Sequence, residues 1–198
     1  GVLPIEIERV SGGRIMVTMT QGRPKLGKTI ADLEELACAL GISADEIGFD
    51  KLPVQVSSTG LDQLMVPLRS PEQVAALTPD FQRLKEFERK TNIAGCYVFA
   101  LKASDPKASV HARFFIPSVG VPEDPSTGSA AGALGAYLVG HGIFGSDSPA
   151  SFNVEQGAEM RRPSVMTVTV RQDQGIPTLV KVGGTSVTVL DGHIVLAG

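Results

Sequence analysis

The sequence predicts an α+β fold in which a curved, mostly antiparallel or mixed sheet wraps around one buried helix. Three observations support this fold. Short segments with alternating apolar residues occur at both ends of the chain, amphipathic helical segments lie in its first half, and residues 129–139 are apolar on every side. A helix without a polar face has to be buried all round. The closely spaced strand pairs favour hairpins over the crossovers of a doubly wound parallel sheet.

The composition agrees with a folded domain and argues against several classes of protein. The chain has 198 residues, of which 42% are hydrophobic and 20% charged, and its formal net charge is −3. A core can form, and binding to nucleic acid mainly by charge is not expected. No apolar run reaches the roughly 18 residues that cross a bilayer. Cys38 and Cys96 lie in apolar strings, so we expect buried, reduced thiols in a cytoplasmic protein.

Periodicity and turn residues define the elements of the first half. Ile5 and Ile7 alternate with glutamates, which predicts a half-buried strand, and residues 15–20 alternate as its hairpin partner. The polar residues 21–28 are our candidate for a linker between subdomains. The other elements expected here are a helix at 29–40, a helical turn after Ser43, strands at 53–58 and 62–68, helices opening at Ser70-Pro71 and at Thr78-Pro79, and strands at 95–101 and 109–116.

The second half is rich in strands apart from the apolar helix 129–139. Runs of β-branched residues bounded by Gly, Pro and Asp predict these strands. We place them at 151–155, 164–171, 177–182, 185–190 and 193–197.

The segment 120–132 carries most of the functional information. It is a polar loop, rich in Gly and Pro, that runs directly into the apolar helix. The first turn of a helix has unpaired backbone N–H groups at the positive end of the helix dipole. Gly128 lets a ligand approach the backbone, and Thr127 and Ser129 add hydroxyl donors. These features predict a pocket for a carboxylate or a phosphate.

Two interpretations of this segment remain open from its residues. Asp124, Thr127 or Ser129 could simply cap the helix, which is the commoner role for such residues at a helix start. Alternatively the segment binds a ligand, and Asp124 handles a proton or a hydrogen bond beside the anion. The adjacent Glu123 would face elsewhere in an extended loop, so we interpret it as structural.

The sequence lacks the motifs of several other activities. It contains no Gly-Lys-Ser/Thr phosphate loop and no glycine-rich dinucleotide fingerprint after a strand. Thr127 stands where a nucleophile elbow around Ser129 would need glycine, so a hydrolase using Ser129 has little support. His111, His141 and His193 show no metal-ligand spacing. These residues therefore predict neither a metal site nor a site for a dinucleotide.

The string EDPSTGSAAGALGAYL at 123–138 is similar to the signature of the PhzF-like family of phenazine biosynthesis proteins, which shares its fold with diaminopimelate epimerase. Residues 113–120 match the family's approach to this motif, and Ser58-Thr59-Gly60 resembles its substrate-facing turn. Residues 156–164 and 182–196 resemble a later strand start and the family's ending. The resemblance covers nearly the whole chain.

This resemblance implies two similar lobes, each a curved sheet around a central helix, with the active site between them. It implies a cofactor-independent isomerase or epimerase that moves a proton on a small acidic metabolite. A lobe without its partner lobe would expose apolar surface, which predicts a homo-oligomer. Matched residue by residue, Asp124 is the motif's catalytic aspartate. The substrate-binding residues implied are Thr127, Gly128, Ser129 and Ala130 and, on a weaker match, Ser58, Thr59 and Gly60.

The sequence departs from the family on its N-terminal side. The family's principal catalytic glutamate and its Gly-His-Pro segment belong there, and neither occurs in these residues, where Gly140-His141 and Gly192-His193 are not followed by Pro. We expect residues 1–24, alone or with 190–198, to be a remnant of the first lobe, and residues 25–189 to be the second.

The missing glutamate bears on activity. Losing the main proton-transfer group costs roughly 10²–10⁴ in rate or more. We therefore expect the chain by itself to be a weak or inactive isomerase. The alternative is a non-catalytic module derived from the family that binds anions or oligomerises.

Overall fold

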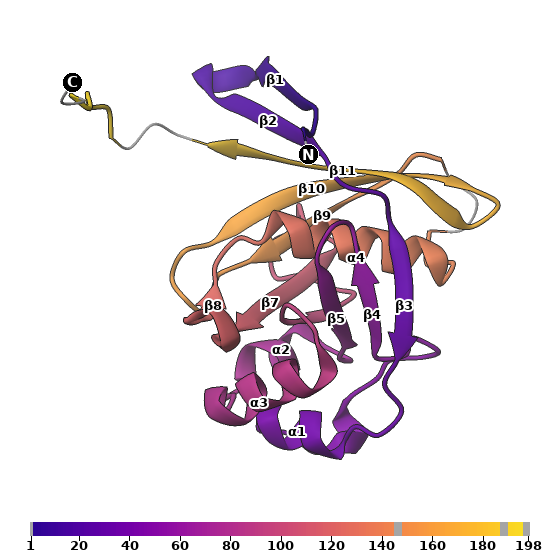
Figure 1. Ribbon diagram of the computed structural model, residues 1–198. Coiled ribbons are helices and arrows are strands. Elements are labelled where there is room, and N and C mark those ends of the chain that lie inside the picture. Colours follow the sequence, from indigo (N-terminus) through magenta and orange to yellow (C-terminus); the bar gives the residue numbers. More distant parts are fainter. Residues whose placement is uncertain (1, 145–147, 187–189, 196–198) are drawn as a thin grey trace.

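The computed structural model describes residues 2–144, 148–186 and 190–195 (Figure 1). Its strands are β1 (Ile5–Arg9), β2 (Ile15–Thr20), β3 (Lys25–Thr29), β4 (Gln55–Ser58), β5 (Asp62–Pro67), β6 (Cys96–Ala100), β7 (Val110–Ile116), β8 (Val121–Asp124), β9 (Ala150–Gln156), β10 (Ser164–Asp173) and β11 (Ile176–Ser186). Within the described residues they form one sheet in the order β1-β2-β11-β10-β9-β7-β6-β5-β4-β3, and β8 pairs with β7 off this path. The pairs β5/β6 and β7/β9 are parallel and the others are antiparallel.

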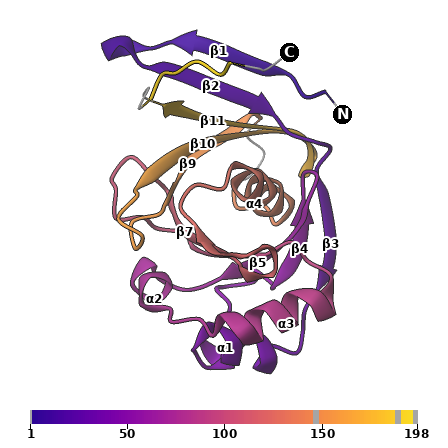
Figure 2. The ribbon, with the colours of Figure 1, turned by 60° about the vertical axis from the view of Figure 1, so that its left-hand side comes forward.

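The sheet curls around helix α4 (Gly128–Gly140), as Figure 2 shows. Residues 130–139 of the helix are all buried, and they pack in one hydrophobic cluster with inward-facing sheet residues such as Val168 and Val180. The packing is close at Gly135, where a Cβ atom would lie 2.6 Å from Cγ1 of Val168. Such interiors pack as densely as organic crystals. The predicted α+β fold with a curved mixed sheet around a buried helix is confirmed.

Three further helices lie outside the curl, namely α1 (Glu34–Leu40), α2 (Pro71–Ala76) and α3 (Phe81–Thr91) (Figure 2). Alternate residues of the central strands serve the two sides. Met65 and Tyr97 belong to the cluster around α4, whereas Val66 and Val98 pack with the outer helices in a second cluster. The period of two in strand side chains thus gives the sheet two buried faces here.

The prediction of a linker at 21–28 is wrong for its second half. Residues Lys25–Thr29 form the edge strand β3, which pairs with β4, and Ile30 N donates to Val54 O at 2.8 Å. Because this pairing holds Thr29 in a strand, the helix expected from residue 29 begins only at Glu34. The helix expected after Thr78-Pro79 begins at Phe81, where the Asp80 carboxylate accepts from two backbone N–H groups.

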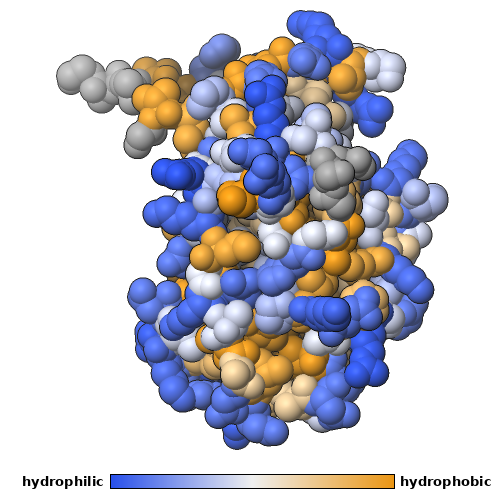
Figure 3. All heavy atoms as spheres, turned by 90° about the vertical axis from the view of Figure 1, so that its right-hand side faces the viewer, coloured by the Kyte–Doolittle hydropathy of each residue, from blue (hydrophilic) through white to orange (hydrophobic). Residues whose placement is uncertain are grey.

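The hairpin of β1 and β2 forms as predicted, with Ile7 opposite Val17, but the predicted burial of its isoleucines is not found. The exposed fractions are 52% for Ile5 and 69% for Ile7. The pairing of β2 with β11 places the hairpin beyond the curl, out of reach of α4 (Figure 1). In the space-filling view, apolar side chains reach the surface among charged ones in this upper part of the molecule (Figure 3).

Two expectations for the end of the chain need correction. Residues 177–182 and the start of the strand expected at 185–190 belong to one long strand, β11, since residues 183 and 184 stay paired with β2. Residues 190 and 193–195 lie in no strand. Residues 187–189 and 196–198 lie outside the described residues, so the boundary of the proposed lobes, at 24/25 and around 190, stays a prediction.

The two cysteines differ in their surroundings. Cys96 is buried as predicted, and burial raises the pKa of its thiol. Cys38 is exposed, because the apolar face of the short helix α1 carries its neighbours Ala37 and Ala39 inward instead. None of the helices described is long and apolar enough to cross a membrane.

Candidate functional site

The candidate site lies where β8 leads into α4. Strand β8 follows a tight turn at Gly120, whose φ is +86°, and pairs antiparallel with the end of β7, with Asp124 opposite Phe114. The next residue, Pro125, has no N–H to continue the ladder. The strand therefore stops at Asp124, and the helix begins at Gly128.

Asp124 is held in a network of directed hydrogen bonds. The hydroxyl of Thr127 donates to Oδ2 of Asp124 at 2.5 Å. The amide nitrogen of Gln156 in turn donates to the Thr127 hydroxyl oxygen at 3.0 Å and to the backbone oxygen of Asp124 at 2.6 Å. Because the Thr127 oxygen accepts from Gln156, its own proton is directed at the carboxylate. Asp124 itself stays only half-buried.

The same network extends through Gln156 to a buried tyrosine. Oε1 of Gln156 accepts from the backbone N–H of Thr127 at 3.3 Å and from the hydroxyl of Tyr97 at 3.0 Å. Burial and, to a smaller degree, the charge of Asp124 raise the pKa of Tyr97 well above its ordinary value, so this hydroxyl stays a donor. No pattern in the sequence predicted a role for Gln156 or Tyr97. Gln156 stood out only within residues 156–164, which resemble a later strand start of the family.

The first turn of α4 provides backbone donors beside Asp124. Residue Thr127 is the N-cap, yet its side chain makes no capping hydrogen bond, and the first turn contains no acidic residue. The hydroxyl of Thr127 donates to Asp124 instead. The simple helix cap considered above is therefore not made by the N-cap side chain. The N–H groups of Gly128, Ser129 and Ala130 stand at the positive end of a 13-residue helix.

Ser129 is oriented by a residue that the sequence analysis missed. The amide nitrogen of Gln63, on β5, donates to Oγ of Ser129 at 3.1 Å, and the Thr59 hydroxyl lies 3.5 Å from the backbone oxygen of Ser129. Since Ser129 accepts from Gln63, its own proton is available for another acceptor. Gln63 is 1% exposed, and its Oε1 has no partner among the described residues. A polar residue at an inward strand position was its only signal.

The turn at 58–60 joins β4 to β5 next to the helix. Its Ser58 hydroxyl accepts from Gly60 N at 3.2 Å, and the neighbouring Ser57 donates to Ala133 O in α4 at 2.7 Å. Gly60 has a φ of +144°, a conformation that favours glycine. Of the three predicted residues, Thr59 touches Ser129, whereas the bonds of Ser58 and Gly60 join them to each other.

The described residues contain no group of three His, Cys, Asp or Glu that could hold a metal ion. His111 pairs with Glu155 and Glu159, and His141 with Gln55. Glu123 faces away from Asp124 and forms a bidentate ion pair with Arg113.

Comparison with known proteins places this geometry in a family. The family model of phenazine biosynthesis-like proteins (PhzC-PhzF) matches residues 1–192. Over 99% of the chain and 65% of each relative, the chain is 33% identical to an uncharacterized isomerase of Clostridium acetobutylicum and to a trans-2,3-dihydro-3-hydroxyanthranilate isomerase of Pseudomonas fluorescens.

Solved structures agree with the family match. A PhzF-family phenazine biosynthesis protein from Bacillus anthracis aligns with a TM-score of 0.82 at 28% identity, over 93% of this chain and 62% of that one. A predicted epimerase from Pseudomonas aeruginosa aligns with a TM-score of 0.70 at 29% identity, over 96% and 64%. The chain thus spans less than two thirds of the length of these proteins. It belongs to the phenazine biosynthesis-like protein family.

Proposed function

We propose that the protein is a cofactor-independent isomerase that moves a proton on a small substrate bearing a carboxylate. The observation that carries this proposal is the placement of Asp124 beside the first turn of the buried helix α4, which has no side-chain cap at Thr127. The isomerase names of the relatives from Clostridium acetobutylicum and Pseudomonas fluorescens support the reaction class.

The carboxylate of the substrate would bind at the first turn of α4. The N–H groups of Gly128, Ser129 and Ala130 and the hydroxyl of Ser129 supply donors there, with Thr127 as the N-cap. Residues 130–139 of the helix are buried, whereas Gly128 and Ser129 are partly exposed, so these donors face a ligand from the edge of a region of low dielectric constant. We propose the turn 58–60 as a further wall of this site, contributed through Thr59.

Asp124 would assist the proton transfer. Its carboxylate accepts a hydrogen bond from Thr127 and is only half-buried, so a substrate proton can reach it. The resemblance to the family implies a principal catalytic glutamate in a further N-terminal segment. We propose that this acid/base comes from outside the 198 residues, so that the chain alone has little activity.

The substitution Asp124→Asn in a full-length protein tests this function. We expect turnover to fall by about 10²–10⁴, as for loss of an acid/base group, while the melting temperature changes little. The first substrate to assay is trans-2,3-dihydro-3-hydroxyanthranilate. For any other substrate, the uptake of deuterium from the solvent measures the proton transfer. Retained turnover together with a large loss of stability would instead assign Asp124 a purely structural role.

The exposed hairpin favours a second candidate, a non-catalytic module that binds anions or oligomerises. Ile5 and Ile7 present apolar surface that the described residues do not cover. We therefore propose that the protein is a homo-oligomer. The cytoplasm as its compartment and the lack of a nucleic-acid partner, the latter from the formal net charge of −3, are proposals from the sequence. Light scattering tests the association: a strictly monomeric species at high concentration would contradict it. An inactive full-length protein that still binds carboxylates would favour the module over the enzyme.

A further inference from the structure

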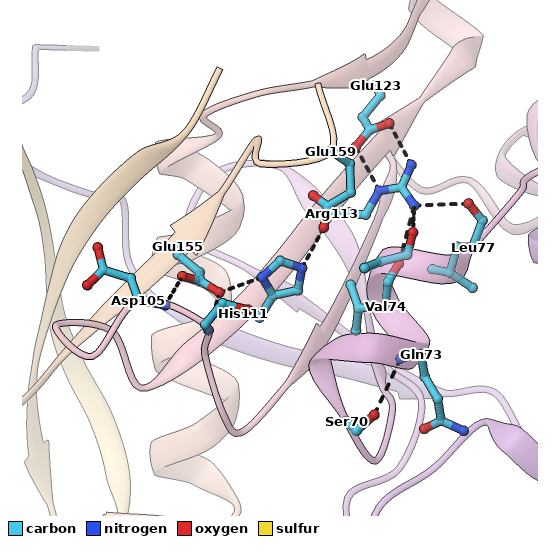
Figure 4. A network of polar contacts seen from close by, with 12 residues as sticks. Ser70, Gln73, Val74, Leu77, Asp105, His111, Arg113, Glu123, Glu155 and Glu159 are labelled. Carbon is cyan, nitrogen blue, oxygen red and sulfur yellow. Dashed lines mark hydrogen bonds and ion pairs between the residues drawn. The ribbon is translucent and has the colours of Figure 1, made fainter. Parts of the chain in front are cut away.

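Two basic side chains stand side by side on the outer face of β7 (Figure 4). His111 and Arg113 are 3% and 7% exposed, and they alternate with Ala112 and Phe114, which belong to the cluster around α4. Neither side chain takes part in the proposed reaction. Buried charges are costly unless each finds a partner, so their partners reveal what they hold in place.

Arg113 ties β8 and α2 to β7. Its Nε and Nη2 donate to the two carboxylate oxygens of Glu123 at 2.8 and 2.9 Å, and its Nη1 donates to the backbone oxygens of Val74 and Leu77 at 3.2 and 3.0 Å (Figure 4). A planar guanidinium that bonds a carboxylate through two nitrogens fixes direction as well as distance. Arg113 therefore sets where β8 lies against β7.

His111 ties β9 and the turn after it to the same strand. Its Nδ1 lies 2.7 Å from Oε1 of Glu155 and its Nε2 lies 2.9 Å from Oε1 of Glu159 (Figure 4). Both ring nitrogens face carboxylates, an arrangement that suits the doubly protonated ring. Glu155 also accepts from the backbone N–H groups of Ser104 and Asp105, each at 2.7 Å.

Glu123 and Glu155 each directly precede a residue of the site network. Glu123 lies opposite Phe115 and is followed by Asp124, and Glu155 lies opposite His111 and is followed by Gln156. Because side chains alternate along a strand, a pair that holds one residue on the outer face turns the next toward the inner face. The two ion pairs thus fix the register that brings Asp124 and Gln156 within a hydrogen bond.

The turn held by Glu159 also packs on the site loop. A Cβ atom on Gly157 would lie 2.6 Å from the backbone oxygen of Pro125, and the hydroxyl of Ser164 donates to that same oxygen at 3.1 Å. A movement of this turn would therefore displace Pro125, which directly follows Asp124.

We propose that Arg113 and His111 are positioning residues for the candidate site, acting through Glu123 and through Glu155 and Glu159. They keep Asp124, Thr127 and Gln156 in one arrangement without touching a substrate. The inference rests on the proposed function only for the catalytic role of Asp124, because the positioning itself can be measured without turnover.

The strength of the interaction of His111 with Glu155 and Glu159 depends on pH, and the direction follows from the pKa of His111. Burial alone lowers its pKa, but hydrogen bonds and negative charges from Glu159 and Glu155 outweigh burial, and the net pKa of His111 is raised. The stabilisation that His111 provides through these glutamates is therefore fully present below its ordinary pKa of 6.5, and it is lost as pH rises through its raised pKa. Among the described residues, Arg113 on β7 also acts on Glu159, and Glu72 on α2 faces both His111 and Lys102.

Hydrogen exchange of the intact chain, followed by mass spectrometry over peptides covering 121–130, tests the proposal. Rates are corrected for the intrinsic pH dependence of exchange. We expect Glu123→Gln and His111→Gln each to speed exchange in 121–130 by about tenfold or more, since each breaks a charge-assisted hydrogen bond. Protection of peptides from α3 should change much less. In the unaltered chain, protection of 121–130 should fall as pH rises through the titration of His111.

The variant Glu159→Gln separates positioning from general stability. It keeps an oxygen acceptor for His111 but removes one charge, so the midpoint of the pH-dependent loss should move to lower pH. The matched control is Glu35→Gln, which breaks the exposed ion pair of Glu35 with Lys90 and should leave 121–130 unchanged. Equal changes in 121–130 and α3, or an unmoved midpoint in Glu159→Gln, would overturn the proposal. Either result is independent of isomerase activity.

Discussion

The curl around α4 and the hairpin of β1 and β2 belong to one sheet but differ in what their side chains touch. Around α4 the inward residues are fully buried, whereas Ile5 and Ile7 show the same period of two and are 52% and 69% exposed. The difference teaches that alternation predicts which residues share a face but not whether another element covers it. Four substitutions measure this contrast.

The largest effect is expected from Leu134→Ala in α4. Leu134 is 0% exposed and lies in the cluster that the sheet surrounds. Truncating such a leucine removes buried contacts and leaves a cavity, at a cost of about 2–5 kcal/mol. Chemical denaturation measures the free energy of unfolding. A loss of less than 1 kcal/mol would mean that the core around α4 is loosely packed, and the contrast with the hairpin would collapse.

Gly135→Ala probes the same core by adding an atom. The new Cβ would lie 2.6 Å from Val168 and 2.9 Å from Val170, and overpacking of this kind costs about 1–3 kcal/mol. The higher helix propensity of alanine opposes this loss by about 1 kcal/mol. The matched control is Gly132→Ala, whose nearest neighbours stand at 3.2 Å and which should cost less. Equal losses would contradict the close approach at Gly135.

Glu88→Gln examines a buried charge in the outer layer. Glu88 is 1% exposed, and burial raises its pKa although Ser118 N donates to it at 2.9 Å. A raised folded-state pKa gives stability that is present below the ordinary pKa and lost as pH rises through the raised value. Between the ordinary and the raised pKa of Glu88, the free energy of unfolding of the unaltered chain should therefore fall with rising pH, relative to that of Glu88→Gln. Glu86→Gln, on the exposed side of the same helix, should leave the fall in place.

The smallest effect is expected from Ile7→Ala. The side chain is mostly exposed in this chain, and surface substitutions usually stay within about 0.5 kcal/mol. A loss approaching that of Leu134→Ala would show that Ile7 is buried in solution. Light scattering on the same sample would then reveal whether a second copy covers it.

The elements that the sequence predicted best are those whose signals are local. The buried helix forms within one residue of each predicted end, because no polar residue offers it a solvent face. Ser70 caps α2 through Gln73 N, as the Ser-Pro start predicts. The linker at 21–28 failed because a polar edge strand has the composition of a loop, and only β4 supplies its partner.

The candidate site was predictable in part. The segment from Asp124 to Ala130 is contiguous, so its residues meet wherever the helix begins. Gln156 and Gln63 come from β9 and β5, far away in the sequence, and nothing local distinguishes them from other strand residues. The same holds for the ion pairs of Arg113 and His111, whose partners lie across strand pairs.

By itself the sequence determined the class of fold, the buried helix and the loop that leads Asp124 to it, because these depend on neighbours in the chain. Tertiary structure alone decided the rest. It directed the Thr127 hydroxyl to Asp124 rather than to a helix cap, brought Gln156 and Gln63 to the loop, and left Ile7 uncovered. The physical reason is that strand pairing joins residues dozens of positions apart, and no pattern along the chain records which strands become neighbours.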